Sequence, residues 1–213
     1  MTNPVTTLHG LYGITDATLL PDARLFTGVE QALQAGVRLI QYRNKSGDAR
    51  KRLLEARQLV ALCEHYSGCL IINDDVQLCR DSGAHGVHLG QTDTPVDVAR
   101  QELGSAIIIG ATCHQDIALA HQAQEMGASY VAFGRFFPSF TKPGAPAADL
   151  SVLQAAKEQL TVPTVAIGGV NAENGASLLA SGANMLAVAH SLFATNDIKA
   201  NAESLLNLFQ QQR

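Results

Sequence analysis

Two cationic side chains stand two residues apart in the segment QYRNK (residues 41–45). Side chains of an extended chain alternate between its faces, so Gln41, Arg43 and Lys45 share one face and Tyr42 lies on the other. Two cations beside an amide are suited to binding a phosphate or diphosphate. Solvated loop charges are the alternative interpretation, and this segment alone does not decide between the two.

Two carboxylates follow two further apolar runs. Asp74 comes directly after the run CLIIN (69–73), and Asp93 comes shortly after the run GVHLG (86–90). Mg²⁺ in proteins is commonly held by one or two carboxylates together with phosphate oxygens of the substrate. Helix capping is the commoner role of a single loop aspartate, and Asp75 suits that role. Two carboxylates and the two cations, taken together, predict a metal–diphosphate site.

Hydroxyls, glycines and a lysine supply further candidates for anion binding. Thr112 ends an apolar run, and the segment SFTK (139–142) combines two hydroxyls with a lysine. Pro143-Gly144 predicts a turn in a loop able to close over a ligand. Gly168-Gly169 would let a phosphate approach the backbone closely, although a tight turn alone would also explain this pair.

Eight short apolar runs alternate with segments of helical period at intervals of roughly 25 residues. This alternation predicts parallel strands joined by helices, and eight units favour a (β/α)8 TIM barrel formed by residues 1–213 as one domain. A doubly wound sheet favours a G-x-G-x-x-G turn after its first strand, which the sequence GITDATLL lacks. The expected strands are 11–15, 38–43, 69–73, 86–90, 106–112, 130–136, 163–169 and 185–190.

Such a barrel would gather the candidate residues at one mouth. Its chemistry sits at the carboxyl ends of the strands, and the loops after the seventh and eighth strands commonly bind phosphate. Gly169, Ala189 and His190 would then lie at the phosphate end of the site. His88 lies inside the fourth expected strand, where we expect a buried histidine with satisfied ring nitrogens.

The composition excludes several classes of partner. Fifteen Lys and Arg against nineteen Asp and Glu give a formal charge of −4, which argues against nucleic acid. No apolar run approaches the ~20 residues that span a bilayer, so no membrane partner is expected. No signal-peptide pattern opens the sequence and no cysteines form a C-x-x-C pair, so we expect a cytoplasmic protein with reduced, buried thiols. The sequence does not distinguish a monomer from a small homo-oligomer.

Seven short motifs are spread over nearly the whole chain, and their order is more informative than any one of them. They are YGITD (12–16), QYRNK (41–45), INDD (72–75), GVHLGQTD (86–93), GATCH (110–114), FGRFFPSFTK (133–142) and AIGGV (166–170). In this order they resemble the thiamine-phosphate synthase family. The resemblance implies a (β/α)8 transferase whose small-molecule substrates are a pyrimidine methyl diphosphate and a thiazole phosphate, and which releases diphosphate.

The resemblance also implies a role for each candidate residue. Mg²⁺ is the implied cofactor, with Asp74 and Asp93 as its ligands. The implied reaction is dissociative, and its implied catalytic residues are Arg43, Lys45, Lys142 and Thr112. The three cations and Mg²⁺ would stabilise the departing diphosphate. The implied substrate contacts are Gln41, Tyr42, Arg43, Asn44, Lys45, Asn73, Thr112, Ser139, Phe140, Thr141, Lys142, Gly169, Ala189 and His190.

Four positions depart from the common pattern of the family. Thr112 replaces a serine and Ser139 replaces a threonine, so each keeps a hydroxyl, whereas Arg135 replaces a proline. His190 stands where many members have a serine near the thiazole phosphate. Either the His190 side chain or the backbone N–H beside it is therefore expected to contact that phosphate.

Two other functions remain open on the sequence alone. A thiazole tautomerase is built on the same barrel, and His114 would suit it as an acid or base. A non-catalytic regulator that binds thiamine phosphate is the second alternative. Neither needs a complete diphosphate and metal site, so the presence of that set favours the synthase. The sequence does not show whether the thiazole carries a carboxylate that is lost as carbon dioxide.

Overall fold

Eight parallel strands close into a barrel in this computed structural model, which describes residues 8–138 and 148–210. Each strand pairs with its neighbours along the chain, and β1 closes the ring by pairing with β8. This topology confirms the predicted (β/α)8 barrel, whereas the assignment of all 213 residues to one domain stays a prediction. The strands are β1 (Gly10–Ile14), β2 (Leu39–Tyr42), β3 (Cys69–Asn73), β4 (Gly86–Leu89), β5 (Ile108–His114), β6 (Tyr130–Phe133), β7 (Thr164–Ile167) and β8 (Met185–Val188).

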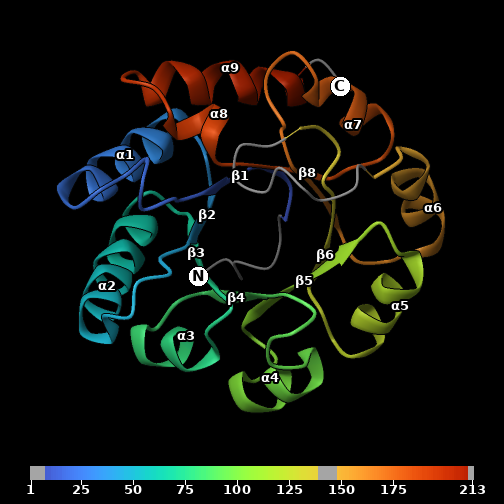
Figure 1. Cartoon of the computed structure of the whole chain (residues 1–213), viewed down its shortest axis with the longest axis horizontal. Helices are drawn as coiled ribbons and strands as arrows, with labels where there is room; N and C mark the ends of the chain where they lie inside the picture. Colours follow the sequence, from blue (N-terminus) through green and yellow to red (C-terminus); the bar gives the residue numbers. More distant parts are fainter. Residues whose placement is uncertain (1–7, 139–147, 211–213) are drawn as a thin grey trace.

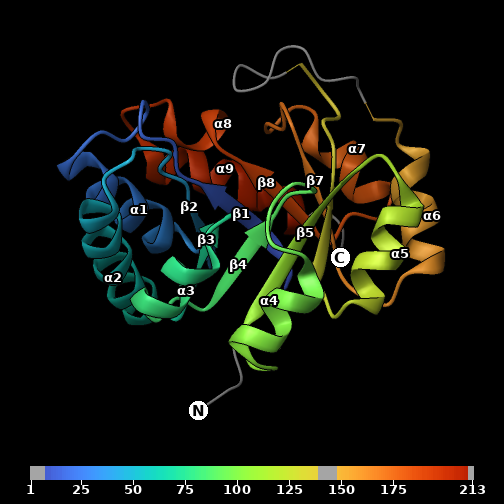
Figure 2. The ribbon, with the colours of Figure 1, turned by 60° about the horizontal axis from the view of Figure 1, so that its bottom comes forward.

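Helices surround the barrel in the view down its axis (Figure 1). Turning the molecule shows α1 and α2 on one flank of the strands and α5 and α6 on the other (Figure 2). Within the described ranges, no helix is long and apolar enough to cross a membrane. The helices are α1 (Ala23–Ala35), α2 (Ala49–His65), α3 (Val76–Ser82), α4 (Val96–Leu103), α5 (Ile117–Glu125), α6 (Ser151–Gln159), α7 (Gly175–Ala180), α8 (His190–Phe193) and α9 (Ile198–Gln210).

The core has two layers, one between strands and helices and one inside the barrel. Strand β2 shows how alternation builds both, because Ile40 and Tyr42 belong to the outer layer while Leu39 belongs to the inner one. The two faces expected for this strand are thereby confirmed. Side chains of other strands, Tyr12 and Tyr130 among them, fill the barrel interior, so it is a packed core and not a pore.

Most strand ends differ by one to three residues from the sequence-based expectation, and β6, which was expected to reach residue 136, already ends at Phe133. β5 was expected over 106–112 and covers Ile108–His114, because pairing with β4 starts only where Ile108 lies opposite Gly86. β8 was expected to reach residue 190 but ends at Val188, and His190 begins the short helix α8. In both places an apolar run continues past the hydrogen-bonded part of the strand, so its length does not mark the strand end.

The cysteines lie in this packed interior as expected for free thiols. Cys63, Cys79 and Cys113 are buried and Cys69 is partly buried, and none of the four forms a disulfide. Burial raises the pKa of Cys63, Cys79 and Cys113 to about 12. These thiols therefore stay protonated at neutral pH and are poor nucleophiles.

Candidate active site

Gln41 brings the first polar group into the barrel mouth. It is 3% exposed, and its Nε2 donates a hydrogen bond of 2.8 Å to the Tyr12 hydroxyl on β1. The next residue, Tyr42, points to the opposite face of β2, where its hydroxyl donates to Glu55 of α2. Alternation along the strand thus separates an inward amide from an outward phenol.

A chain of hydrogen bonds continues from Gln41 across the barrel interior. The hydroxyls of Tyr12 and Tyr130 lie 2.9 Å apart, and the Tyr130 hydroxyl lies 2.9 Å from Nδ1 of His88. Nε2 of His88 in turn lies 2.9 Å from the hydroxyl of Thr112. Both ring nitrogens of His88 are hydrogen-bonded as expected, but the residue is partly buried and not fully buried. The two ends of the chain are two candidate substrate contacts, Gln41 and Thr112.

Tyr12 and Tyr130 are site residues that the sequence reasoning missed. Burial raises the pKa of both phenols, so each keeps its proton and can donate one hydrogen bond within the chain. The Tyr130 ring needs Gly110 as its neighbour, because a Cβ at that position would lie 2.0 Å from its Cζ. Two signals could have found them: Tyr12 lies in the YGITD motif, and Tyr130 occupies an inward position of its strand.

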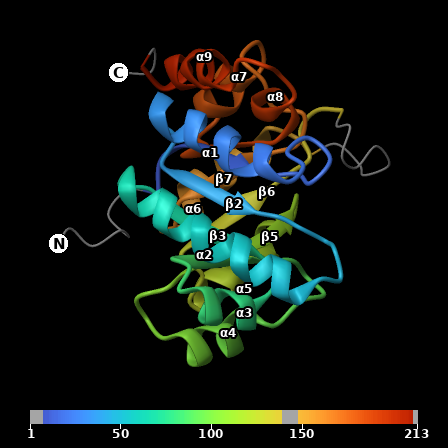
Figure 3. The same ribbon diagram turned by 90° about the vertical axis from the view of Figure 1, so that its left-hand side faces the viewer.

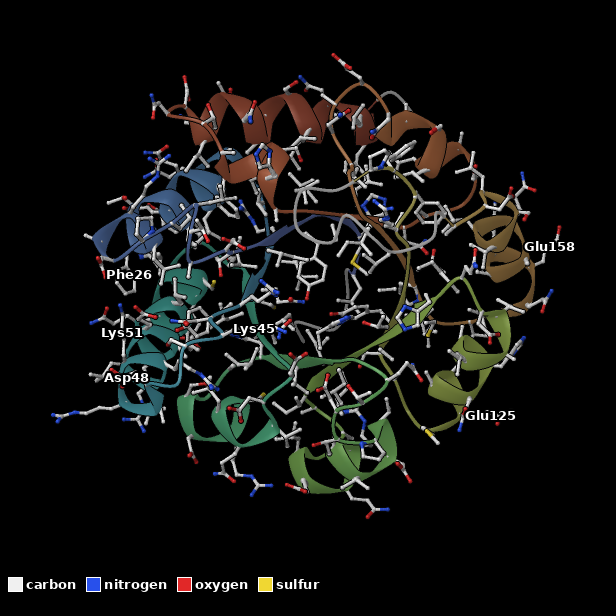
Figure 4. The ribbon with its side chains drawn as sticks, viewed as in Figure 1. Phe26, Lys45, Asp48, Lys51, Glu125 and Glu158 are labelled. Atoms are coloured by element: carbon white, nitrogen blue, oxygen red, sulfur yellow. The ribbon has the colours of Figure 1, made fainter. Side chains whose placement is uncertain are left out.

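The two predicted cations each lie beside a carboxylate at the mouth. Nη1 of Arg43 lies 3.6 Å from Oδ2 of Asp16, and the Arg43 backbone N–H donates to the Thr15 hydroxyl. Nζ of Lys45 lies 3.9 Å from Oδ2 of Asp74. In the view down the barrel, Lys45 lies inside the ring of helices, whereas Lys51 lies out at α2 (Figure 4). Asp16 therefore joins the site as a partner of Arg43 that the sequence reasoning did not assign.

The carboxylates of Asp74 and Asp93 come together from the ends of β3 and β4. Burial, and then the charge of Asp93, raise the pKa of the Asp74 carboxyl, and Lys45 partly offsets this rise. Asp93 is oriented by the backbone N–H of Gly90, which donates to its Oδ2 over 2.7 Å. Two mutually repelling carboxylates beside a mouth that holds cations form an arrangement that a divalent metal ion would stabilise.

Asp75 has a structural role beside the proposed metal site, and the number of possible protein ligands there is small. Asp75 caps α3 by accepting from the Leu78 N–H, as expected, and it is paired with Arg52 of α2. Over residues 8–138 and 148–210, no group of three or more His, Cys, Asp or Glu side chains could hold a metal ion. Two carboxylates that leave the remaining positions to water and substrate oxygens match the usual coordination of Mg²⁺.

The loops after β7 and β8 form the other side of the mouth. Gly168 and Gly169 both have positive φ, and a Cβ at Gly169 would lie 2.3 Å from the Pro138 carbonyl oxygen. These two glycines let the β7 loop pass closely against the chain that follows β6. Ala189 is the N-cap of α8, and the exposed His190 is its first residue. The close packing explains the glycine pair, and phosphate binding here stays a prediction.

Four candidate substrate contacts, Ser139, Phe140, Thr141 and Lys142, lie outside the described residues. The chain on either side of them is placed at the mouth. Phe137 donates its N–H to the Gly168 carbonyl over 3.0 Å, and Ala148 donates its N–H to the Arg135 carbonyl over 2.7 Å. The described residues on both sides of this segment therefore lie beside the carboxyl ends of β6 and β7.

Some of the remaining candidate side chains lie at the barrel mouth and others lie on the helix side of β2. The structure brings Lys45 to Asp74, pairs Arg43 with Asp16 and bonds Gln41 to Tyr12. Asn73 ends β3 directly before Asp74. The side chain of Asn44 instead lies with Tyr42 and Glu55 on the helix side of β2. The side chains of Tyr42 and Asn44 are therefore not directed into the barrel mouth.

Known proteins of similar sequence and structure point to one family. The family model described as thiamine monophosphate synthase matches residues 11–192. The thiamine-phosphate synthase of Saccharophagus degradans is 53% identical over 201 residues, covering 94% of this chain and 93% of the relative. That of Alcanivorax borkumensis is 47% identical over 213 residues, covering 99% and 98%. The structure of thiamine phosphate pyrophosphorylase from Pyrococcus furiosus superposes with a TM-score of 0.85 at 30% identity, covering 98% of this chain and 97% of that chain.

Proposed function

Because this chain belongs to the thiamine monophosphate synthase family, we propose that its barrel mouth joins a pyrimidine methyl diphosphate to a thiazole phosphate. The chain is a transferase, and the products of the proposed reaction are thiamine phosphate and diphosphate. The observation that carries the proposal is the grouping of Arg43 and Lys45 with Asp74 and Asp93 at the ends of adjacent strands.

Asp74 and Asp93 are the residues that would hold Mg²⁺. Their facing carboxylates, the raised pKa of Asp74 and the lack of a third acidic ligand among the described residues fit an ion that shares its coordination with a diphosphate. When bound there, Mg²⁺ supplies positive charge that stabilises the diphosphate as a leaving group.

The cationic side chains at the mouth bind and stabilise the leaving diphosphate. Arg43 and Lys45, with Lys142 from the segment outside the described residues, hold the diphosphate and stabilise the negative charge that it gains as its C–O bond to the pyrimidine methyl group breaks. The thiazole nitrogen then donates its electron pair to the resulting pyrimidine methyl cation and forms the new C–N bond. No nucleophile from the protein is needed in this dissociative sequence.

Neutral groups orient the two substrates. Gln41, Asn73 and Thr112 would hold the pyrimidine diphosphate, and the hydrogen-bond chain through the interior fixes the first and last of these. The proposed contacts of the thiazole phosphate are Ser139, Phe140, Thr141, Gly169, Ala189 and His190. A 2-carboxylated thiazole would be accepted in the same place and would lose carbon dioxide after the coupling.

A product assay tests the proposed function. The purified protein, Mg²⁺ and both substrates should yield thiamine phosphate and diphosphate in equal amounts, and omission of either substrate should abolish both products. Isomerisation of the thiazole phosphate alone would favour the tautomerase alternative. Binding of thiamine phosphate without any turnover would favour a regulator.

The proposal also includes the compartment in which the protein works and its oligomeric state. Four free cysteines suit a compartment that keeps thiols reduced, so we place the protein in the cytoplasm. It would work there as a monomer or a small homo-oligomer on small-molecule substrates.

Replacing His190 by serine tests which group holds the thiazole phosphate. If the imidazole contacts the phosphate, His190→Ser should change the KM for the thiazole phosphate several-fold, because a different side chain then faces the phosphate. Initial rates with the pyrimidine substrate saturating measure this KM.

The matched control is His121→Ser, since His121 lies on α5 and its Nε2 lies 3.2 Å from a side-chain oxygen of Gln159. This variant should keep the KM of the parent. An unchanged KM in His190→Ser would show that the side chain does not contact the phosphate and would leave the backbone contact.

A further inference from the structure

Glu55 is a buried carboxylate on α2 that the proposed reaction does not use. Its side chain is 11% exposed, and its Oε2 accepts hydrogen bonds from the Tyr42 hydroxyl over 2.5 Å and from Nδ2 of Asn44 over 3.1 Å. Nδ2 of Asn44 also lies 3.1 Å from the Tyr42 hydroxyl. The three side chains form a closed triangle, which we call the β2–α2 latch: Tyr42, Asn44 and Glu55.

The latch directs the amide of Asn44 away from the barrel mouth. Nδ2 of Asn44 donates within the latch, and its Oδ1 accepts the Ser46 backbone N–H over 2.9 Å. An asparagine amide offers two donors and one acceptor oxygen, so the latch and the Ser46 turn take up most of its bonding capacity. This geometry does not suit Asn44 as a direct substrate contact, which was its expected role.

Fixing Asn44 outward has a consequence for its two neighbours. Side chains alternate in an extended segment, so an outward Asn44 turns Arg43 and Lys45 toward the mouth, where they meet Asp16 and Asp74. The latch borders a cavity of about 110 Å³ that Arg43 and Asn44 also line. At the edge of this cavity, the hydrogen bonds of the latch and of the Ser46 turn hold the loop to α2.

Helix α2 gives the latch a rigid base. It lies between α1 and α3 on the outside of the barrel, as Figure 3 shows. Burial and the neighbouring Glu55 raise the pKa of Tyr42, so its hydroxyl keeps the proton that it donates. Lys51 of the same helix lies 3.7 Å from Glu55 and 3.0 Å from Asp22, which connects the latch to the loop after β1.

We propose that Tyr42, Asn44 and Glu55 are positioning residues that set Arg43 and Lys45 at the spacing needed to hold the diphosphate. The proposal rests on the proposed function, since the ligand of the two cations is the diphosphate of that reaction. None of the three side chains needs to touch the substrate. Their effect passes through the backbone of residues 43–46.

Asn44→Ala, Glu55→Gln, Tyr42→Phe and the double variant Asn44→Ala/Glu55→Gln test the latch. Amide hydrogen exchange on the protein without ligand should show faster exchange of the Ser46 N–H in Asn44→Ala. Titration with inorganic diphosphate and Mg²⁺ should show affinity reduced roughly 2- to 10-fold in each single variant, the size of the net contribution of one hydrogen bond. The KM for the pyrimidine diphosphate should rise in step, while the KM for the thiazole phosphate should stay unchanged.

Non-additivity distinguishes positioning from direct contact. If the latch acts as one unit, the double variant should bind diphosphate about as well as either single variant. The matched control is Tyr66→Phe, which removes another hydroxyl–carboxylate bond of 3.0 Å, to Glu30, at the far end of α2. It should leave exchange in 43–46 and diphosphate affinity unchanged.

Three results would overturn the proposal. In the first, the losses of diphosphate affinity of the two single variants multiply in the double variant, which would make Asn44 a direct contact of the ligand. In the second, the Ser46 N–H of Asn44→Ala exchanges at the rate of the parent. In the third, that N–H exchanges faster but the affinity for diphosphate is unchanged. Should Glu55→Gln fail to fold, Tyr42→Phe removes a single oxygen and carries the same predictions. A parent protein that forms no thiamine phosphate would refute the proposed function, while exchange and diphosphate binding would still decide the latch.

Discussion

Asp74→Asn and Asp93→Asn are each expected to lower kcat roughly 10²- to 10³-fold, because a bound metal ion contributes several kcal/mol of charge stabilisation to a departing diphosphate. Asparagine keeps the shape of the side chain, and at position 93 its oxygen can still accept the Gly90 N–H. The loss should therefore reflect the missing negative charge. Steady-state rates over a series of Mg²⁺ concentrations, with both substrates saturating, measure it.

The same variants separate metal binding from folding. Burial and Asp93 raise the pKa of Asp74 in the folded protein, so the ionised carboxylate opposes folding at neutral pH and its contribution improves as the pH falls through the raised pKa. Asp74 also has a positive φ of 66°, a conformation that asparagine tolerates well. Asp74→Asn without metal should therefore melt no lower than the parent at neutral pH.

Asp97→Asn is the matched control, because Asp97 is an exposed aspartate in the first turn of α4. It should keep the kcat of the parent. Full activity of the Asp74 and Asp93 variants in a chelator would refute the assignment of these carboxylates to a metal ion.

Arg43→Gln should reduce kcat roughly 10²- to 10³-fold and change the KM for the pyrimidine diphosphate less. Removing one preorganised charge that stabilises a transition state commonly has this effect. The charge on the diphosphate grows as its C–O bond breaks, so the guanidinium contributes more in the transition state than in the bound ground state. Lys142→Gln is expected to behave in the same way from the sequence resemblance.

Single-turnover rates and steady-state KM values measure the two effects separately. Arg57→Gln is the control, since Arg57 lies on α2 and donates to the Asp81 carbonyl away from the mouth. A rise in KM with kcat unchanged would mean that Arg43 binds the diphosphate equally in both states. That result would assign the stabilisation of the leaving group to other residues.

Local patterns determined the inner and outer faces of β2 and the position of the charged residues. Leu39 and Gln41 point inward, and Ile40 and Tyr42 point outward, because alternation is a property of any extended chain with one face toward each layer. Arg43, Lys45 and Asp74 were predictable in the same way, since each lies within three residues of the end of a strand and parallel strands end at one edge.

Strand ends were less predictable than strand positions. Residues 106 and 107 continue the apolar run of β5 without pairing, and Ala189 continues that of β8 as the cap of a helix. Apolar character reports burial, whereas a strand ends where its neighbour stops offering hydrogen bonds. The neighbouring strand comes from a different part of the chain, so the apolar run alone does not predict where the pairing stops.

The sequence by itself determined the barrel, the family and the positions of Arg43, Lys45 and Asp74 after the strands, because these follow from periodicity and from motifs that are continuous in the chain. The tertiary structure decided which of those residues meet. Tyr12 and Tyr130 touch across 118 positions, and Asn44 turns from the mouth to Glu55, 11 positions further along. Such contacts depend on strand register, on barrel closure and on the rotation of α2 against β2, and none of these is encoded in a short stretch of residues.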